Sequence, residues 1–363
     1  MKKRKLEADK IRRVVVRGTN WVGDAVMTVP ALRELRRVLP HAHITLCTRP
    51  WSEGIFEDAD FVDDLLLYDR SKGLRSVARQ IKEWRNRKFD LAVLFQNAFE
   101  AAALATGARV PTRLGYATDG RRALLTHPLA APGWRGARHE VFYYLNLVGE
   151  LEQLLYGTSD AMQREPQFDL KVSAARQDKA REMLHDAGAR RDSPLVALCP
   201  GSTNSLAKRW PARSYAELAD KITGEMGANV ILIGSQDELD VSREVASLMR
   251  SQPVMLTGRT NLAQAVAVLS LTDVLVSNDT GPAHIAAALN RPTLVIFGPT
   301  DPTTTRPFSP VAEVIRKPPD CAPCMLRVCP IDHRCMTAIT PDEIYARAAS
   351  LMEQMTATET QRH

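Results

Sequence analysis

The chain has 363 residues, which is more than one typical core needs and suits two domains of about 150–200 residues each. Its 45% hydrophobic and 25% charged residues are ordinary for a globular protein, and no apolar run reaches the ~18–20 residues that span a bilayer. The net charge of +6 gathers in Met1–Arg13, which carries seven Lys or Arg and two acidic residues without the apolar segment of a signal peptide. We therefore expect a cytoplasmic protein whose basic start is either a solvated end or a contact for an anionic surface.

The first half alternates apolar runs with amphipathic segments. In chain order, the pattern predicts strand 12–17, helix 25–39, strands 43–48 and 62–68, helix 73–85, strand 90–95, helix 97–105, strand 113–116 and helix 139–156. Alternation of this length predicts a mainly parallel sheet with helices on both faces. The turn 18–24 lacks GxGxxG, so the sequence does not support a dinucleotide fingerprint there.

A polar stretch with Pro166 separates this half from a second alternating series. That series is predicted as helix 174–187, strand 195–199, helix 214–226, strand 229–233, helix 238–249, strand 253–256, helix 261–270, strand 274–276, helix 283–289, a final strand 293–297 and a terminal helix 340–356. We expect an α/β fold with two doubly wound, Rossmann-like domains, residues 1–170 and 171–339, facing across a cleft. The terminal helix could pack back on the first domain.

The stretch from Val274 to Pro292 combines a β-branched strand, a turn of small polar residues and a helix that starts at a proline. This order directs backbone N–H groups and the positive end of a helix dipole to one point, which suits a phosphate. Asp279, Thr280, Gly281 and His284 surround that point. The alternative is an ordinary turn in which residues 278–281 cap the helix.

Two further strand ends of the second half carry polar side chains. Ser202, Thr203 and Lys208 follow strand 195–199, and hydroxyls with an ammonium group suit a diphosphate. A carboxylate of Asp237 or Glu238, which follow strand 229–233, could hold ribose hydroxyls. The alternatives are a solvated basic loop and an acidic partner for a helix dipole.

One carboxylate stands out in the first half. Asp24 follows the first strand, where it could accept a proton from a substrate hydroxyl as a general base, with Asn20 and Trp21 on the acceptor side of the same turn. A helix N-cap is the alternative role of Asp24, and the two roles are compatible.

Cys321, Cys324, Cys329 and Cys335 lie within fifteen residues. Four thiols at such spacing could hold one structural zinc or iron ion, although the spacing is not that of a standard zinc finger and free thiols are the alternative. Their separation in sequence from the phosphate motifs favours a structural role. The remaining Cys47 and Cys199 are expected to be buried thiols.

Together these segments resemble a known family. The residues that carry the resemblance are GTNWVGDAVMTVPAL, CPGST with AKRWP, IGSQDE, SNDTGPAHIAAALNRP with VIFGPTDP, and CAPCMLRVCPIDHRCM. They are similar to the bacterial ADP-heptose:lipopolysaccharide heptosyltransferases, glycosyltransferase family 9, and most of all to the heptosyltransferase II branch. The resemblance runs from about Val14 to Ile344.

The resemblance implies a GT-B glycosyltransferase that moves L-glycero-D-manno-heptose from ADP-heptose to the first heptose of heptose-Kdo2-lipid A, with inversion and with no cofactor required for the chemistry. It implies Asp24 as the base, Lys208 with Ser202 and Thr203 at the donor phosphates, and Glu238 at the ribose. Asp279, Thr280, Gly281 and His284 match the segment around the diphosphate and donor sugar.

It also implies a lipopolysaccharide acceptor at the cytoplasmic face of the inner membrane, which the basic start could contact peripherally. Other hypotheses remain open at this point. They are heptosyltransferase I or III activity, another nucleotide-sugar transferase of this fold, and a dinucleotide-dependent oxidoreductase. Nucleic-acid binding is not expected, because no matching motif is present.

Overall fold

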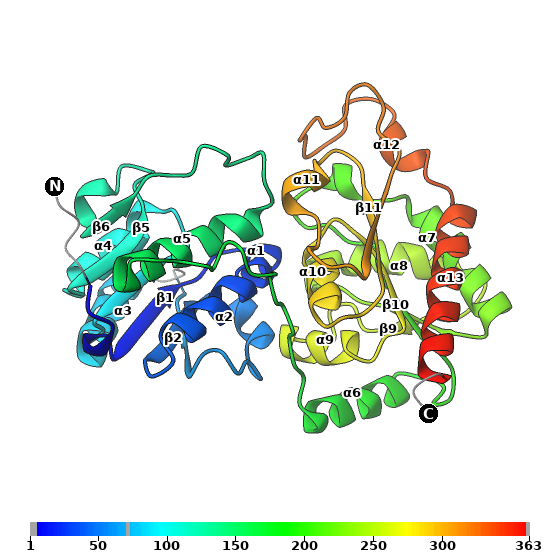
Figure 1. Cartoon of the computed structure of the whole chain (residues 1–363). Coiled ribbons are helices and arrows are strands. Elements are labelled where there is room, and N and C mark those ends of the chain that lie inside the picture. Colours follow the sequence, from blue (N-terminus) through cyan, green and yellow to red (C-terminus); the bar gives the residue numbers. More distant parts are fainter. Residues whose placement is uncertain (1–5, 70–72, 361–363) are drawn as a thin grey trace. The chain divides into compact units, whose positions relative to one another are not determined.

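The computed structural model describes residues 6–69 and 73–360. The chain divides into two compact units, Met1–Phe168 and Asp169–His363, and each is built around one sheet with helices on both faces (Figure 1). The basic residues 2–5 lie outside the described residues.

In the first unit, the strands are β1 (Arg13–Arg17), β2 (His43–Thr48), β3 (Asp64–Leu67), β4 (Leu91–Leu94), β5 (Thr112–Tyr116) and β6 (His127–Leu129). The helices are α1 (Val22–Met27), α2 (Val29–Val38), α3 (Leu74–Arg87), α4 (Phe99–Gly107) and α5 (Glu140–Tyr156). All strand pairs are parallel, in the order β3-β2-β1-β4-β5-β6. Packing of α2 on α5 and of α3 on α4 covers the sheet, so Val14, Val15 and Val16 of the central strand are fully buried.

In the second unit, the strands are β7 (Leu195–Cys199), β8 (Asn229–Leu232), β9 (Val254–Met255), β10 (Val274–Asn278), β11 (Thr293–Phe297) and β12 (Ala312–Arg316). The helices are α6 (Ala174–Asp186), α7 (Ala212–Met226), α8 (Leu239–Leu248), α9 (Leu262–Leu269), α10 (Gly281–Ala288), α11 (Pro302–Thr305), α12 (Arg334–Thr337) and α13 (Pro341–Thr360). This sheet is also parallel, in the order β12-β11-β10-β7-β8-β9. Helix α7 packs against α8 and α13, while α9 packs against α6 and α10 (Figure 1).

Both sheets therefore have the doubly wound, Rossmann-like order that the sequence predicts. In each, the strand order reverses between the first and fourth strands: β1 beside β4 and β7 beside β10. Ligands of such sheets bind outside the carboxyl ends of the strands at this switch point. The loops that leave β1, β4, β7 and β10 are therefore the places to look for chemistry.

Some predicted elements are corrected by the structure. The helix expected over 25–39 is two helices, α1 and α2, which meet at Thr28. The hydroxyl of Thr28 donates to the Ala25 carbonyl at 2.7 Å, and Pro30 has no N–H to continue the ladder of α1. The strand 293–297 is not the last one, because β12 follows it, and the edge strand β6 was missed because Pro128 interrupts its pattern.

The terminal helix α13 belongs to the second unit. Ile344 and Ala348 are fully buried in the same hydrophobic cluster as Trp210 and Ile222 of that unit. The suggestion that helix 340–356 also packs back on the first domain stays a prediction. Its apolar positions are satisfied by the sheet of its own unit, against α7, β10 and β11.

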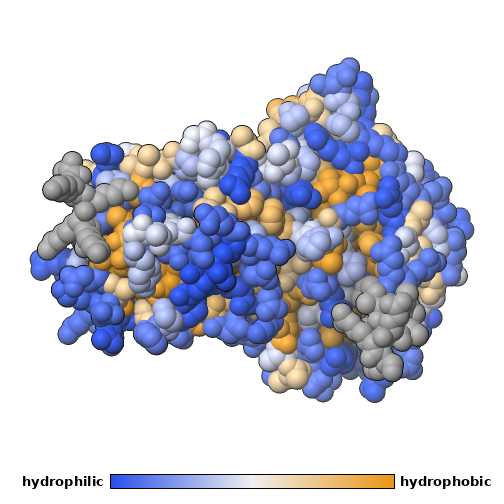
Figure 2. All heavy atoms as spheres, in the orientation of Figure 1, coloured by the Kyte–Doolittle hydropathy of each residue, from blue (hydrophilic) through white to orange (hydrophobic). Residues whose placement is uncertain are grey.

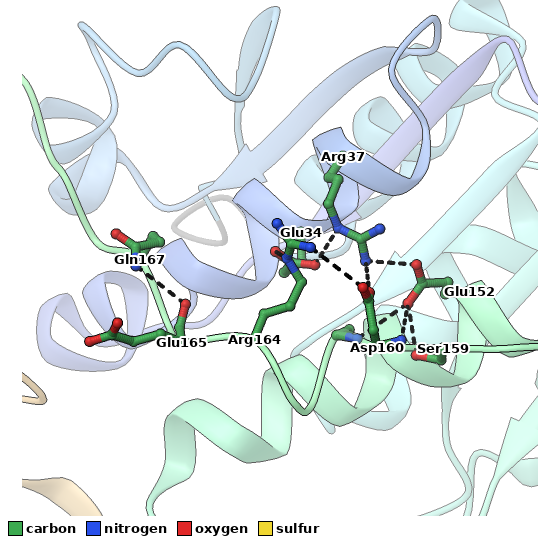
Figure 3. A network of polar contacts seen from close by, with 9 residues as sticks. Glu34, Arg37, Glu152, Ser159, Asp160, Arg164, Glu165 and Gln167 are labelled. Carbon is green, nitrogen blue, oxygen red and sulfur yellow. Dashed lines mark hydrogen bonds and ion pairs between the residues drawn. The ribbon is translucent and has the colours of Figure 1, made fainter.

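An ion-pair network fastens the end of the first unit to its helices (Figure 3). The Arg37 guanidinium on α2 contacts Glu152 of α5 at 2.7 Å and Asp160 at 2.9 Å, and Arg164 contacts Glu34 at 3.3 Å. The segment that follows α5 is therefore held on the first unit at least as far as Arg164. A buried carboxylate such as Glu152 needs partners of this kind.

Hydrophilic residues dominate the face shown in Figure 2, with smaller hydrophobic areas between them. Among the described residues, none of the helices has the length and the apolar character needed to cross a membrane.

Candidate functional site

The loops that leave β7 and β10 are tied together by Asn278, the last residue of β10. Its side-chain amide donates to the carbonyls of Pro200 at 2.9 Å and Gly201 at 3.1 Å. Its side-chain oxygen accepts from the Trp210 backbone at 3.0 Å and the Tyr215 hydroxyl at 3.1 Å. This fully buried amide fixes the switch point of the second sheet. Sequence reasoning treated Asn278 only as a helix cap.

Lys208 and Asp279 meet at this switch point. The Lys208 ammonium lies 2.6 Å from Asp279 Oδ2 and donates to the Asp279 carbonyl at 3.3 Å. The Thr300 hydroxyl, from the turn after β11, donates to the same carboxylate oxygen at 2.8 Å. Asp279 is 7% exposed, whereas the Lys208 side chain is 25% exposed, so Lys208 is the more accessible partner of the pair. The sequence pattern did not single out Thr300.

Helix α10 begins beside this pair. Thr280 is its N-cap residue but makes no capping bond with its side chain; its hydroxyl lies 3.1 Å from Ser277 Oγ instead. The expectation that side chains of 278–281 cap the helix is therefore wrong. The Ala283 amide donates to the Thr280 carbonyl at 3.2 Å and Pro282 has no N–H, so the Gly281 amide is the one at this end with no hydrogen-bond partner among the described residues. Uncapped N–H groups at a helix N-terminus bind anions well. His284 is buried in the first turn.

The hydroxyl-bearing residues of the β7 loop differ in exposure. Ser202 is buried, and its carbonyl accepts from the Arg209 guanidinium at 3.1 and 3.3 Å. Thr203 is exposed. Arg209 thus holds the loop in place, which leaves Lys208 as the cation directed to the Asp279 side.

Glu238 lies at the same edge of the sheet, after β8. Its Oε2 accepts from the Ser235 backbone at 2.8 Å and from the Ser235 hydroxyl at 3.0 Å, which forms a capping box. The carboxylate also packs on Gly201, where an added Cβ would lie 2.3 Å from Glu238 Cδ. Glu238 therefore does act at the start of the helix, as the alternative interpretation of the sequence allowed. Only Oε1 has no partner among the described residues.

The cysteine-rich segment is close to the Lys208 loop, which corrects the expected separation. His333 Nε2 lies 2.6 Å from the Ala207 carbonyl, and the Ala207 amide donates to the Arg327 carbonyl at 3.0 Å. Within 6–69 and 73–360, no group of three or more His, Cys, Asp or Glu side chains could hold a metal ion.

The expected zinc or iron site of Cys321, Cys324, Cys329 and Cys335 is therefore not assembled. All four are free thiols, with Cys321 exposed and Cys335 buried. The loop is held by backbone hydrogen bonds to its neighbours instead.

Asp24 is in the first unit, inside the first turn of α1 and not at its N-cap, which is Trp21. Burial, and to a lesser degree the nearby Glu140 carboxylate, raises the pKa of Asp24 to about 6. Burial also raises the pKa of Glu140, while Arg135 lowers it. A carboxylate with a pKa near neutrality is suited to accept a proton from a hydroxyl.

The other first-unit residues of the predicted site lie next to Asp24. The Asn20 side chain accepts from Arg49 Nε at 2.8 Å, and Trp21 is 59% exposed. The structure thus brings Ser202, Lys208, Asp279, Thr280 and Gly281 together in one unit and places Asp24, Asn20 and Trp21 on one turn of the other.

Comparison with known proteins identifies the family of the chain. The profile described as glycosyltransferase family 9 (heptosyltransferase) matches residues 77–334. Lipopolysaccharide heptosyltransferase 2 of Salmonella typhimurium is 29% identical over 313 residues, which cover 84% of this chain and 88% of the relative. The Escherichia coli protein of the same name has the same identity and coverage.

Solved structures agree in fold. ADP-heptose lps heptosyltransferase II of E. coli matches with a TM-score of 0.80 and 26% identity, over 95% of this chain and 99% of that one. A family 9 glycosyl transferase of Veillonella parvula matches with a TM-score of 0.82 and 23% identity, over 96% and 99% of the two chains, and supports the fold alone. The chain therefore belongs to glycosyltransferase family 9 and is a glycosyltransferase.

Proposed function

We propose that this enzyme transfers L-glycero-D-manno-heptose from ADP-heptose to the first heptose of the lipopolysaccharide inner core, heptose-Kdo2-lipid A, with inversion at the anomeric carbon. The observation that carries the proposal is the Lys208–Asp279 pair beside the uncapped N-terminus of α10. A cation beside the positive end of a helix dipole at a switch point suits the diphosphate of a nucleotide-sugar. The names of the relatives support heptose as the sugar.

Lys208 stabilises the leaving group in this proposal. Negative charge grows on the β-phosphate as the bond to the sugar breaks, so the ammonium, the Gly281 amide and the dipole of α10 act most strongly in the transition state. Ser202 and Thr203 contribute donors to the phosphates, and Thr280 and His284 line the donor sugar. Asp279 orients Lys208 through their 2.6 Å contact.

Glu238 binds the ribose through Oε1, the oxygen that its capping box leaves free. Replacement by Gln keeps an acceptor at this position but weakens the bond to the ribose hydroxyls, because it removes the charge. We expect a higher KM for the donor with little change in kcat. Measurement of ADP affinity in Glu238→Gln tests this role separately from the chemistry.

Asp24 is the general base. It accepts the proton of the acceptor hydroxyl as that oxygen attacks the anomeric carbon, while ADP leaves with the electron pair of the broken C–O bond. A pKa of about 6 leaves Asp24 mostly ionised at pH 7.5, so it is ready to accept a proton. Asn20 and Trp21, on the same turn, face the acceptor.

The step requires no metal in this proposal, because Lys208, the Gly281 amide and the dipole of α10 already compensate the phosphate charge. Transfer rates measured after treatment with EDTA, and after return of Mg²⁺, check this point. A rate that collapses with EDTA and returns with Mg²⁺ would contradict it.

The acceptor is a lipid, and we propose peripheral contact with the cytoplasmic face of the inner membrane. The basic residues 2–5 would attract its anionic headgroups. Replacement of Lys2, Lys3, Arg4 and Lys5 by Ser should reduce sedimentation with anionic vesicles at low salt. Unchanged sedimentation would overturn this part.

The decisive assay uses purified enzyme, ADP-heptose and defined acceptors, with products identified by mass spectrometry. We expect one heptose to be added to heptose-Kdo2-lipid A, and none to Kdo2-lipid A or to an acceptor that already carries two heptoses. UDP- and GDP-sugars should compete poorly with ADP-heptose. Transfer to Kdo2-lipid A instead would indicate the activity of heptosyltransferase I.

A further inference from the structure

The turn that leaves β1 and the turn that leaves β2 share a cluster of arginine and tryptophan that the proposed step does not use. Arg49 follows β2, and Trp51 lies in the short 3-10 helix Pro50–Ile55. The Trp51 indole donates to the Asn20 carbonyl at 2.8 Å, and Arg49 Nε donates to the Asn20 side chain at 2.8 Å. The cluster is therefore joined directly to the turn that carries Asp24.

The Arg49 guanidinium is held but not neutralised. Its carbon lies 5.5 Å from the Trp51 ring centre and 4.9 Å from the Tyr68 ring centre, and Nη1 donates to the Tyr68 carbonyl at 3.3 Å. Arg49 is only 8% exposed, yet among the described residues it has no carboxylate partner. Nη2 likewise has no hydrogen-bond acceptor there.

A second guanidinium strengthens the positive charge. Arg17 is almost completely buried and donates to the carbonyls of Gly18 and Cys47, again without a carboxylate partner in the described part of the chain. Glu100 accepts from the Tyr68 hydroxyl, and its carboxylate acts on Arg17 electrostatically. Neither guanidinium forms an ion pair with a carboxylate among the described residues, and buried charges are normally paired.

The Trp51 indole beside Arg49 is exposed and yet fixed. Trp51 is 51% exposed although its N–H is bound, and Trp21 on the adjoining turn is also exposed. An indole ring that is fixed in position and exposed to water provides a flat apolar surface with a polar edge. The C–H face of a sugar ring fits such a surface.

We propose that Arg49 and Trp51 form an acceptor subsite for an anionic sugar, in which Trp51 stacks on the ring and Arg49 Nη2 binds a carboxylate or phosphate group. The inference rests on the proposed function for the identity of the acceptor, whose inner core offers both kinds of anion. A bidentate guanidinium suits both groups. Asn20 positions Arg49 and connects this subsite to the turn of Asp24.

The test is binding of deacylated heptose-Kdo2 oligosaccharide by calorimetry, with no donor present. Arg49→Gln and Trp51→Leu should each weaken binding at least tenfold, which corresponds to ~1.4 kcal/mol. Arg33→Gln is the matched control, because Arg33 also lies over an aromatic ring, Phe61 at 4.8 Å, but has Asp60 as a carboxylate partner. Tyr156→Leu controls for loss of an exposed ring fixed to a backbone carbonyl.

Chemical variants of the oligosaccharide identify the anion. If Arg49 binds a carboxylate, reduction of the Kdo carboxyl groups removes the difference between wild type and Arg49→Gln; if it binds phosphate, dephosphorylation removes it. Arg49→Lys, which keeps the charge but loses the fork, should bind with intermediate affinity and retain the salt dependence. If Arg49→Gln fails to fold, Trp51→Leu decides alone.

Wild-type affinity in both Arg49→Gln and Trp51→Leu would overturn the inference, as would equal losses in the control variants or no binding by the wild type. These outcomes are distinct from failure of the proposed function, because binding is measured without transfer. An enzyme that transfers heptose normally but binds the oligosaccharide equally well in every variant would keep its function and lose this subsite.

Discussion

Asp24→Asn should abolish transfer and yet make the first unit more stable at neutral pH. Burial raises the pKa of Asp24 from 3.8 to about 6, so the folded state binds more protons than the unfolded state between these values. The free energy of unfolding therefore falls as the pH rises through this window, and the destabilisation is complete above about pH 6. An Asn side chain has no charge to bury at any pH.

A shift of about two pKa units corresponds to ~3 kcal/mol, and partial exposure of the carboxylate to water reduces this to about 1–2 kcal/mol. In a unit of this size that is about 2–8 °C in melting temperature. Thermal unfolding of Asp24→Asn and wild type should be followed by calorimetry from pH 4 to pH 8. We expect the variant to melt higher at pH 7.5 and the difference to vanish near pH 4. A difference in melting temperature that does not depend on pH, or a variant less stable than wild type at pH 7.5, would refute the claim that Asp24 is buried and ionised.

Further predictions concern the donor site, the base and the ion-pair network. Lys208→Ala should lower kcat/KM by about 10²–10³-fold. The second substitution Asp279→Asn should restore the stability of this variant but not its activity, because it neutralises the carboxylate that lost its lysine partner. Equal activity of Lys208→Ala and wild type would contradict the role of Lys208 at the leaving group. On the acidic side, the pH profile of kcat/KM should reach half its maximum near pH 6. Glu140→Gln should move this midpoint to lower pH, because it removes a negative charge close to Asp24. An unchanged midpoint would show that Glu140 does not raise the pKa of Asp24. Arg37→Ala should cost about 1–3 kcal/mol of stability, measured by urea unfolding, with kcat unchanged; a lower kcat would give the network a role in turnover.

The doubly wound sheets could be predicted because the periodicity and the length of the apolar segments identify the strands and helices. Buried parallel strands such as β1 and β10 are continuous apolar runs, and helices of ten or more residues fit only right-handed crossovers between them. The short edge strands were not predicted, because the three residues of β6 include a proline and β12 follows a proline-rich turn. The break at Thr28 needed a side-chain hydrogen bond that no periodicity reveals.

The candidate site was predictable in part, because strand ends of a parallel sheet converge. That convergence brought Lys208 and Asp279 together as the sequence indicated. Contacts between residues far apart in the chain were not predictable: Asn278 reaches the β7 loop, and Thr300 reaches Asp279. The approach of His333 to the Lys208 loop also depends on tertiary packing, so sequence separation was a poor guide to distance.

The most direct test of the account separates donor binding from transfer in one variant pair. Affinity for ADP-heptose by calorimetry and heptose transfer to heptose-Kdo2-lipid A should be measured for Asp24→Asn and Lys208→Ala. The account predicts that Asp24→Asn binds the donor like wild type but transfers no heptose, whereas Lys208→Ala binds the donor more weakly and also transfers heptose more slowly. Transfer by Asp24→Asn at the wild-type rate, or unchanged donor affinity in Lys208→Ala, would contradict it.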